Sequence, residues 1–219
     1  GEYILNKICE DGFTHYEQSV RIVEVLEKDG RGLNLTWEVR DGIRNHRTSG
    51  HPSTLEGAIV RLSDKIAYIN HDIDDAIRAR MFTEHELPRV YTDVLGHSVR
   101  ERLNNMIHDI ILNSMDKPAI TMSEGMEEAM QGLRKWMFDN VYKNDIPKAE
   151  EGKAQNMITQ LYEYYMGHVD KLPVEYVLLM VNKGEKKSRV VCDYIAGMSD
   201  IYAIDQFEEL FVPKRWNVY

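Results

Sequence analysis

Cysteine is scarce in this sequence, which holds only Cys9 and Cys192 among 219 residues. The two stand far apart in the chain, each within a segment whose apolar spacing is helical. Small proteins that depend on disulfides or zinc carry several closely spaced cysteines. The count therefore excludes a disulfide framework, and no zinc site follows from it. It predicts reduced thiols, as in a cytoplasmic protein.

Long apolar runs are missing, and so is an excess of positive charge. No apolar stretch approaches the ~20 residues that span a bilayer, and the acidic start Gly1-Glu2-Tyr3 is unlike a signal peptide. With 27 basic and 36 acidic side chains the formal net charge is −9, so any phosphate contact needs locally placed Lys or Arg. These features predict a globular cytoplasmic protein with neither a membrane nor a nucleic acid as partner.

Alternating strand patterns are also lacking, and apolar residues three or four apart dominate the chain. Gly and Pro interrupt this pattern at several loops. The segments expected to be helical are 14–29, 36–45, 53–80, 98–115, 123–142, 148–169 and 185–202, and 203–211 continues the last or begins another. No internal repeat or clean linker is evident. The sequence therefore predicts one all-α domain covering residues 1–219, with a sizeable buried core.

The most informative stretch is the polar side of the helix expected over residues 53–80. Asp64, Lys65, Tyr68 and Asp72 fall within two helical turns on neighbouring faces. Two carboxylates, an ammonium and an aromatic ring can hold a metal, a phosphate and a sugar, which predicts a nucleotide site. The competing interpretation is a solvated charged face with Tyr68 half buried.

Apolar neighbours favour the nucleotide site over the solvated face. Leu62 and Ile66 flank Asp64, and an isoleucine stripe follows the same helix at positions 59, 66, 69, 73 and 77. This pattern indicates a deeply packed helix. A carboxylate inside a packed bundle needs a partner, and a cation is a suitable one.

His15 is the second candidate, in the first turn of the helix expected over residues 14–29. A helix N-terminus disfavours imidazolium and attracts anions, which suits a histidine that faces phosphate or an attacking water. The alternative is a histidine that caps its own helix. The individual claims of five further side chains are weaker: Glu2, Glu17, His46, His51 and His71.

His108-Asp109 is the dipeptide that many metal phosphohydrolases use, but its setting argues against a metal site. The pair lies mid-helix, without a glycine-rich turn or an upstream histidine to converge on the same ion. We therefore interpret it as structural.

Several motifs occur in an order that matches a known family. They are Gly12-Phe13-Thr14-His15, Gly32-Leu33-Asn34-Leu35-Thr36, Thr54-Leu55-Glu56-Gly57, Asp64-Lys65-Ile66-Ala67-Tyr68 with His71-Asp72, and Asp193-Tyr194-Ile195-Ala196-Gly197-Met198-Ser199-Asp200. With them the chain resembles the HD-superfamily deoxynucleoside triphosphate triphosphohydrolases, in the bacterial dGTPase-like branch. The resemblance implies a multi-helix HD-domain-like bundle, with active-site helices in 1–82 and a helical remainder in 83–219.

The resemblance also implies an activity, which is metal-dependent hydrolysis of a dNTP such as dGTP to deoxynucleoside and tripolyphosphate. In that family Asp64 would be a ligand to Mn²⁺ or Mg²⁺, Lys65 would contact phosphate, Tyr68 would pack against deoxyribose and Asp72 would accept a hydrogen bond from the 3′-hydroxyl. His15 resembles the catalytic histidine, Glu2 the acidic residue that orients a histidine, and Tyr142 a sugar-side tyrosine. Family members commonly form homo-oligomers.

One departure from the family pattern concerns the metal. The first metal histidine and the His-Asp pair of the family should precede Glu2, and they are absent from residues 1–219. One carboxylate should bind Mg²⁺ or Mn²⁺ weakly, because affinity rises with the number of ligands. We therefore expect this chain, as the C-terminal part of such an enzyme, to be inactive on its own.

Two other functions remain open. The first is an HD-type phosphohydrolase that acts on another phosphate ester, against which the combination of Lys65, Tyr68 and Asp72 favours a nucleoside triphosphate. The second is a non-catalytic nucleotide-binding or assembly module, which the absent metal ligands support.

Overall fold

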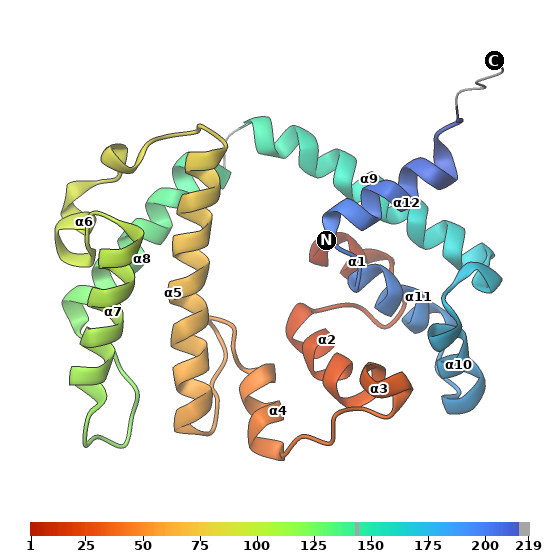
Figure 1. Ribbon diagram of the computed structural model, residues 1–219, viewed down its shortest axis with the longest axis horizontal. Helices are drawn as coiled ribbons and strands as arrows, with labels where there is room; N and C mark the ends of the chain where they lie inside the picture. Colours follow the sequence, from red (N-terminus) through yellow and green to blue (C-terminus); the bar gives the residue numbers. More distant parts are fainter. Residues whose placement is uncertain (143–144, 215–219) are drawn as a thin grey trace. The chain divides into compact units, whose positions relative to one another are not determined.

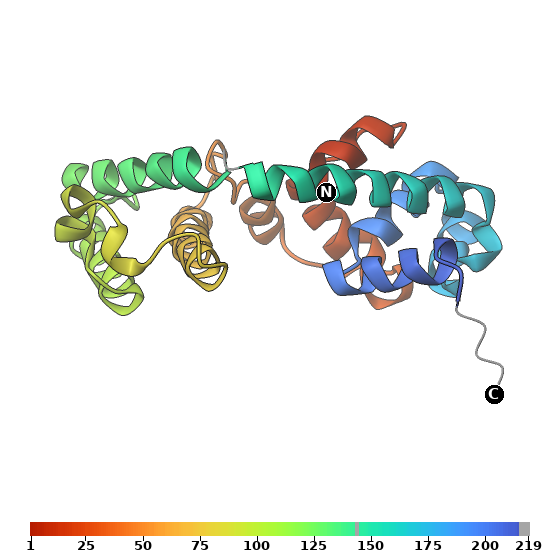
Figure 2. The ribbon, with the colours of Figure 1, turned by 90° about the horizontal axis from the view of Figure 1, so that it is seen from above.

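A computed structural model describes residues 1–142 and 145–214 of the chain. Every regular element in these ranges is a helix (Figure 1, Figure 2), which confirms the all-α prediction. Contacts divide the chain into two compact units, one made of Gly1–Asn34 and Ala149–Tyr219 and the other of Leu35–Lys148. The predicted single domain with a division near residue 82 stays a prediction, because a contact boundary does not test independent folding.

The first unit is built from both ends of the chain. Its elements are α1 (Glu2–Ile8), α2 (His15–Arg21), the π-helix η1 (Ile22–Leu26), α3 (Glu27–Gly30), most of α9 (Asp145–Gly167), the 3₁₀ turn η4 (Val169–Lys171), α10 (Val174–Lys183), α11 (Lys187–Ala196) and α12 (Asp200–Phe211). Its core centres on α11, where Val190, Val191 and Cys192 are completely buried. This apolar run was expected to be core, and α11 is the helix that the rest of the unit covers.

Two predicted helices of this unit are interrupted. The helix expected over 14–29 passes into η1 and ends at Lys28 and Asp29, whose φ angles of 52° and 56° are left-handed. The helix expected over 185–202 is two helices, because α11 ends at Ala196 and Ser199 begins α12 by accepting a hydrogen bond from the backbone N–H of Tyr202 at 3.3 Å. A serine at this position favours the start of a new helix, because its side chain caps a backbone N–H of the first turn.

The second unit carries the nucleotide-site candidates. Its elements are α4 (Trp37–Arg44), α5 (Leu55–Arg78), the 3₁₀ turn η2 (Glu84–Glu86), α6 (Arg89–Leu95), α7 (Val99–Ser114), α8 (Glu124–Met137) and the π-helix η3 (Phe138–Tyr142). Ile66, Ile69 and Ile73 of α5 pack into a core with buried residues of α6, α7 and α8. The long helix expected over 53–80 is therefore confirmed as α5.

Two contacts fix α5 in its unit. At its start, Thr54 Oγ1 accepts a hydrogen bond from Gly57 N–H at 3.0 Å. Gly57 also lies close to α4, because the Cβ of any residue that replaced it would be 3.4 Å from the Cα of Gly42. Further along, buried Asn70 accepts a hydrogen bond from Arg102 Nε of α7 at 2.9 Å. The guanidinium of Arg102 is fully buried and also pairs with Glu84. One face of α5 is thus held by packing and buried polar contacts, and the opposite face remains accessible.

No helix in residues 1–142 and 145–214 is both long and apolar enough to cross a membrane.

Candidate active site

The accessible face of α5 carries the four residues expected to form the nucleotide site. Lys65, Tyr68 and Asp72 follow each other at helical spacing, with Asp64 beside them. Asp64 and Tyr68 are exposed, Tyr68 by 53%, while Lys65 and Asp72 are partly buried. The structure therefore places all four side chains on one accessible side of a single helix.

The expectation that packing would bury Asp64 is wrong, because its side chain is exposed. Leu62 and Ile66, two positions before and after Asp64, are buried. Residues two apart on a helix do not share a face, so apolar neighbours at this distance direct Asp64 outward. Within the part of the chain that the structure describes, the Asp64 carboxylate has no hydrogen bond or ion pair. It is accessible to a ligand.

Two arginines that the sequence analysis did not single out lie near Lys65. Arg61, one turn earlier on α5, donates from Nη1 to the backbone oxygen of Thr48 at 3.3 Å. Arg134 of α8 donates from Nη1 to Oγ1 of the same threonine at 3.2 Å. We call Arg61, Lys65 and Arg134 the basic cluster. Both arginines of the basic cluster therefore bond to the same loop residue, Thr48.

Burial and the repulsion between like charges dominate the electrostatics of the basic cluster. Burial lowers the pKa of the Lys65 ammonium below its usual value, and the charges of Arg61 and Arg134 lower it further, while Glu127 opposes them. Arg61 Nε is buried without a hydrogen-bond partner. A buried N–H of this kind normally has a partner, and phosphate oxygens are well suited to a guanidinium.

The sugar-side candidates are only partly described. Tyr68 follows Lys65 by three residues, and its ring is half exposed. Tyr142 is the last residue of η3, and its side chain lies outside the described residues. The predicted pairing of these two tyrosines around a sugar stays a prediction.

In the first unit, the structure brings Glu2 and His15 together. Glu2 of α1 contacts His15 Nδ1 through Oε2 at 2.8 Å and accepts the backbone N–H of His15 through Oε1 at 3.2 Å. Both side chains are about half exposed. A carboxylate that accepts a hydrogen bond from Nδ1–H fixes the tautomer in which Nε2 is the acceptor nitrogen. The arrangement suits a histidine that accepts or donates a proton at Nε2.

A buried polar network holds the helix of His15 against α11. Asp193 accepts hydrogen bonds from Gln18 Nε2 at 3.0 Å and from Arg21 Nε at 2.9 Å. Burial opposes the charge of Arg21, but the hydrogen bonds that its guanidinium donates to Asp193 and Glu185 outweigh burial and raise its pKa. Arg189 also donates to Asp193, at 3.2 Å. The bonds from Gln18 and Arg21 to this buried carboxylate thus position α2 against α11.

Comparisons with known proteins show which family the chain is similar to. Residues 120–209 match the model of a family described as "Phosphohydrolase-associated domain". The chain is 51% identical over 216 residues to the deoxyguanosinetriphosphate triphosphohydrolase-like protein of Caldanaerobacter subterraneus subsp. tengcongensis, covering 99% of this chain and 63% of that protein. It is 33% identical over 269 residues to the protein of the same name from Geobacter sulfurreducens, covering 97% and 69%.

The chain belongs to the deoxyguanosinetriphosphate triphosphohydrolase-like family. A third member, from Clostridium perfringens, is 40% identical over 223 residues, covering 98% of this chain and 65% of its own. The chain thus spans slightly less than two thirds of the relatives from Caldanaerobacter and Clostridium perfringens, at 63% and 65% of their lengths. It carries the basic cluster and the Glu2–His15 pair within that share.

The described residues do not make a metal site by themselves. In the described part of the chain, no group of three or more His, Cys, Asp or Glu side chains is placed to hold an ion. Asp64 offers one carboxylate, and a single carboxylate is a weak site for a divalent cation. We therefore derive no catalytic step through a metal from these residues.

In the His108-Asp109 pair, Asp109 makes contacts that hold two helices together. His108 is exposed on α7. The Asp109 carboxylate accepts hydrogen bonds from the backbone N–H of Ser123 at 2.7 Å and from Asn113 at 3.1 Å. Asp109 thereby fastens the start of α8 to α7.

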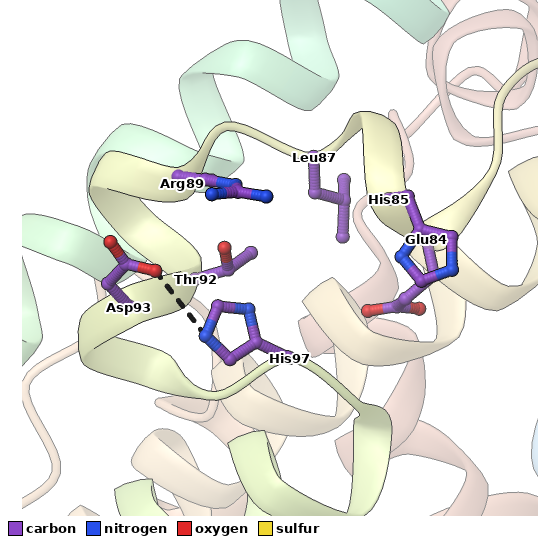
Figure 3. A pocket seen from close by; sticks show the side chains of 7 residues that line it. All are labelled: Glu84, His85, Leu87, Arg89, Thr92, Asp93 and His97. Carbon is purple, nitrogen blue, oxygen red and sulfur yellow. Dashed lines mark ion pairs between the residues drawn. The ribbon is translucent and has the colours of Figure 1, made fainter.

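A cavity of about 310 Å³ in the second unit contains none of the predicted site residues. It lies between η2 and α6, where Figure 3 shows Arg89, His85 and His97 around the opening. The ring of His97 faces Asp93, and the two make an ion-pair contact of 3.4 Å (Figure 3).

Proposed function

We propose that the complete protein hydrolyses deoxynucleoside triphosphates, such as dGTP, to the deoxynucleoside and tripolyphosphate. The observation that carries this proposal is the basic cluster beside Tyr68 and Asp72 on one accessible face of α5. The chain belongs to a family whose members are named deoxyguanosinetriphosphate triphosphohydrolase-like proteins, and this supports a phosphohydrolase activity. The proposal adds two statements to this family membership, the identity of the substrate and the bond that breaks.

The triphosphate would lie against the basic cluster. Arg61 and Arg134 would each present a planar guanidinium to phosphate oxygens, and Lys65 would add an ammonium between them. An anion bound there would relieve the repulsion that lowers the pKa of Lys65. It would also give the buried Nε of Arg61 an acceptor.

The sugar would lie further along α5, toward its C-terminal half. The Tyr68 ring, packed against deoxyribose, would crowd a 2′-hydroxyl, so the site would favour dNTPs over NTPs. The Asp72 carboxylate would accept a hydrogen bond from the 3′-hydroxyl, and Tyr142 would contact the same sugar.

His15 would transfer a proton during the reaction, and Glu2 would orient its ring. Glu2 holds Nδ1, at 2.8 Å, so Nε2 is the atom that would exchange a proton with an attacking water or with the leaving group. The network around Asp193 would position the helix that carries His15. His15 would thus act on the reaction, and Asp193 would act only through α2.

The metal completes the proposal. The family resemblance implies Mn²⁺ or Mg²⁺, with Asp64 as one ligand, and the described residues supply no cluster for the others. We therefore expect residues 1–219 alone to be inactive, and the protein extended toward the full length of its relatives to be active.

The experiment compares the two proteins with each of the four dNTPs in the presence of Mn²⁺. Release of tripolyphosphate by the extended protein alone is the expected result. Release by residues 1–219 would contradict the predicted inactivity. Release of tripolyphosphate by neither protein would overturn the proposed activity and favour the nucleotide-binding or assembly module.

A further inference from the structure

Two cysteines from distant parts of the sequence meet inside the first unit. Cys9 directly follows α1, which is red in Figure 1, and Cys192 lies in α11, which is blue. Both are free cysteines, and the side-chain interaction between them is the largest influence on the pKa of each thiol. They belong to the same buried core. The pair is therefore already assembled without a covalent bond.

The two thiols differ in access and in chemistry. Cys9 is 5% exposed, whereas Cys192 is completely buried, so a small reagent reaches Cys9 first. The hydrogen bond from Cys192 lowers the pKa of the Cys9 thiol, and Arg189 lowers it further, against the effect of burial. The same hydrogen bond and burial raise the pKa of Cys192. Because the thiolate is the nucleophile, Cys9 is the more reactive sulfur.

We propose that Cys9 and Cys192 are a peroxide-sensitive pair that converts reversibly into an intramolecular disulfide. The Cys9 thiolate attacks a hydroperoxide, so that an S–O bond forms, the O–O bond breaks, and the departing hydroxide or alkoxide takes a proton. Cys192 then attacks the sulfur of the Cys9 sulfenic acid. The S–S bond forms, the S–O bond breaks, and water leaves with the thiol proton of Cys192.

The second step follows from the first. The raised pKa of Cys192 has the hydrogen bond to Cys9 as its largest cause. Oxidation of Cys9 to sulfenic acid removes the thiolate, and with it the charge that keeps Cys192 protonated. In each cycle the two sulfurs lose two electrons and the peroxide gains them. A dithiol reductant reverses the change.

The cross-link joins two elements that the chain itself separates widely. It closes a loop from residue 9 to residue 192 and ties α1 to the central helix α11. A loop of this length restricts the unfolded chain strongly. The oxidised protein is thus expected to melt at a higher temperature than the reduced protein.

The test uses the folded, fully reduced protein and hydrogen peroxide. After the peroxide is quenched, remaining thiols are alkylated with N-ethylmaleimide and the intact mass is measured before and after reduction. The expected product carries no maleimide, has lost two hydrogens, and yields a peptide pair that joins Cys9 to Cys192. It regains two maleimide sites after treatment with dithiothreitol.

Two variants separate the roles of the sulfurs. In Cys192→Ser, Cys9 should accumulate a sulfenic acid that dimedone traps. In Cys9→Ser, Cys192 should be oxidised at least about tenfold more slowly than Cys9, because it remains a buried thiol. Circular dichroism confirms that each variant is folded, and Cys→Ala versions replace any that is not.

Three results would overturn the proposal, and the wild-type protein alone can give each of them. The first is oxygen addition to both cysteines without a cross-link. The second is a disulfide that forms only between chains. The third is a Cys9–Cys192 disulfide that appears only after unfolding in urea.

Discussion

Replacing Arg61 with glutamine removes one positive charge from the basic cluster and keeps a shorter, neutral polar side chain. Arg61 makes one hydrogen bond to the backbone oxygen of Thr48, and its buried Nε has no partner. In the proposed complex this guanidinium donates to phosphate oxygens. A hydrogen bond to a charged group contributes about 1.5–3 kcal/mol. Arg61 is only partly buried, so the lower part of this range applies, and Arg61→Gln should weaken tripolyphosphate binding about tenfold.

The assay is isothermal titration of residues 1–219 with tripolyphosphate at low salt, where exposed charges are least screened. Arg78→Gln is the matched control, because it makes the same change on the same helix at an exposed position that pairs with Asp74. Its affinity should equal that of the unmodified chain. Equal affinities for all three proteins would refute the role of Arg61. Equal losses in both variants would show that only net charge matters and would refute the basic cluster as a local site.

Three other changes test separate parts of the structure. Gly57→Ala should lower the free energy of unfolding in urea by about 1–3 kcal/mol, because its Cβ would lie 2.7 Å from Pro52 Cβ, whereas Gly125→Ala, with nothing within 4 Å, should not destabilise the protein. Tripolyphosphate affinity should fall as the pH rises toward the lowered pKa of Lys65, below the usual 10.5, and Lys65→Gln should remove that dependence; an unchanged pH profile in the variant would contradict it. Tyr68→Ala in the complete enzyme should relax the preference for dNTPs over NTPs, measured as the ratio of kcat/KM, and unchanged discrimination would argue against the sugar contact.

Much of the fold follows from local sequence rules. The helix expected over 98–115 is α7 (Val99–Ser114), and Ser98 caps it by accepting the backbone N–H of Glu101 at 3.2 Å. The break between α11 and α12 was missed because apolar residues continue across Gly197 to Tyr202. There the capping preference of Ser199 overrides the apolar pattern. Helical spacing therefore predicts which segments are helical better than it predicts where one helix ends.

The candidate site was predictable only where it lies on one helix. The stripe of Lys65, Tyr68 and Asp72 follows from the helical period alone. Arg61 shares that face, one turn before Lys65, and the same rule could have found it. Arg134 could not have been found, because it reaches the cluster through tertiary packing of α8 and a shared contact with Thr48. The outward position of Asp64 shows that apolar neighbours two residues away do not bury a side chain.

The products of the reaction test the central claim most directly. The protein extended toward the full length of its relatives is incubated with dGTP and Mn²⁺, and the phosphorus species are followed by ³¹P NMR. The account predicts intact tripolyphosphate together with deoxyguanosine, since the bond at the α-phosphorus breaks. Pyrophosphate with dGMP, or inorganic phosphate with dGDP, would contradict it, because the enzyme would then cleave within the triphosphate that the basic cluster is proposed to hold.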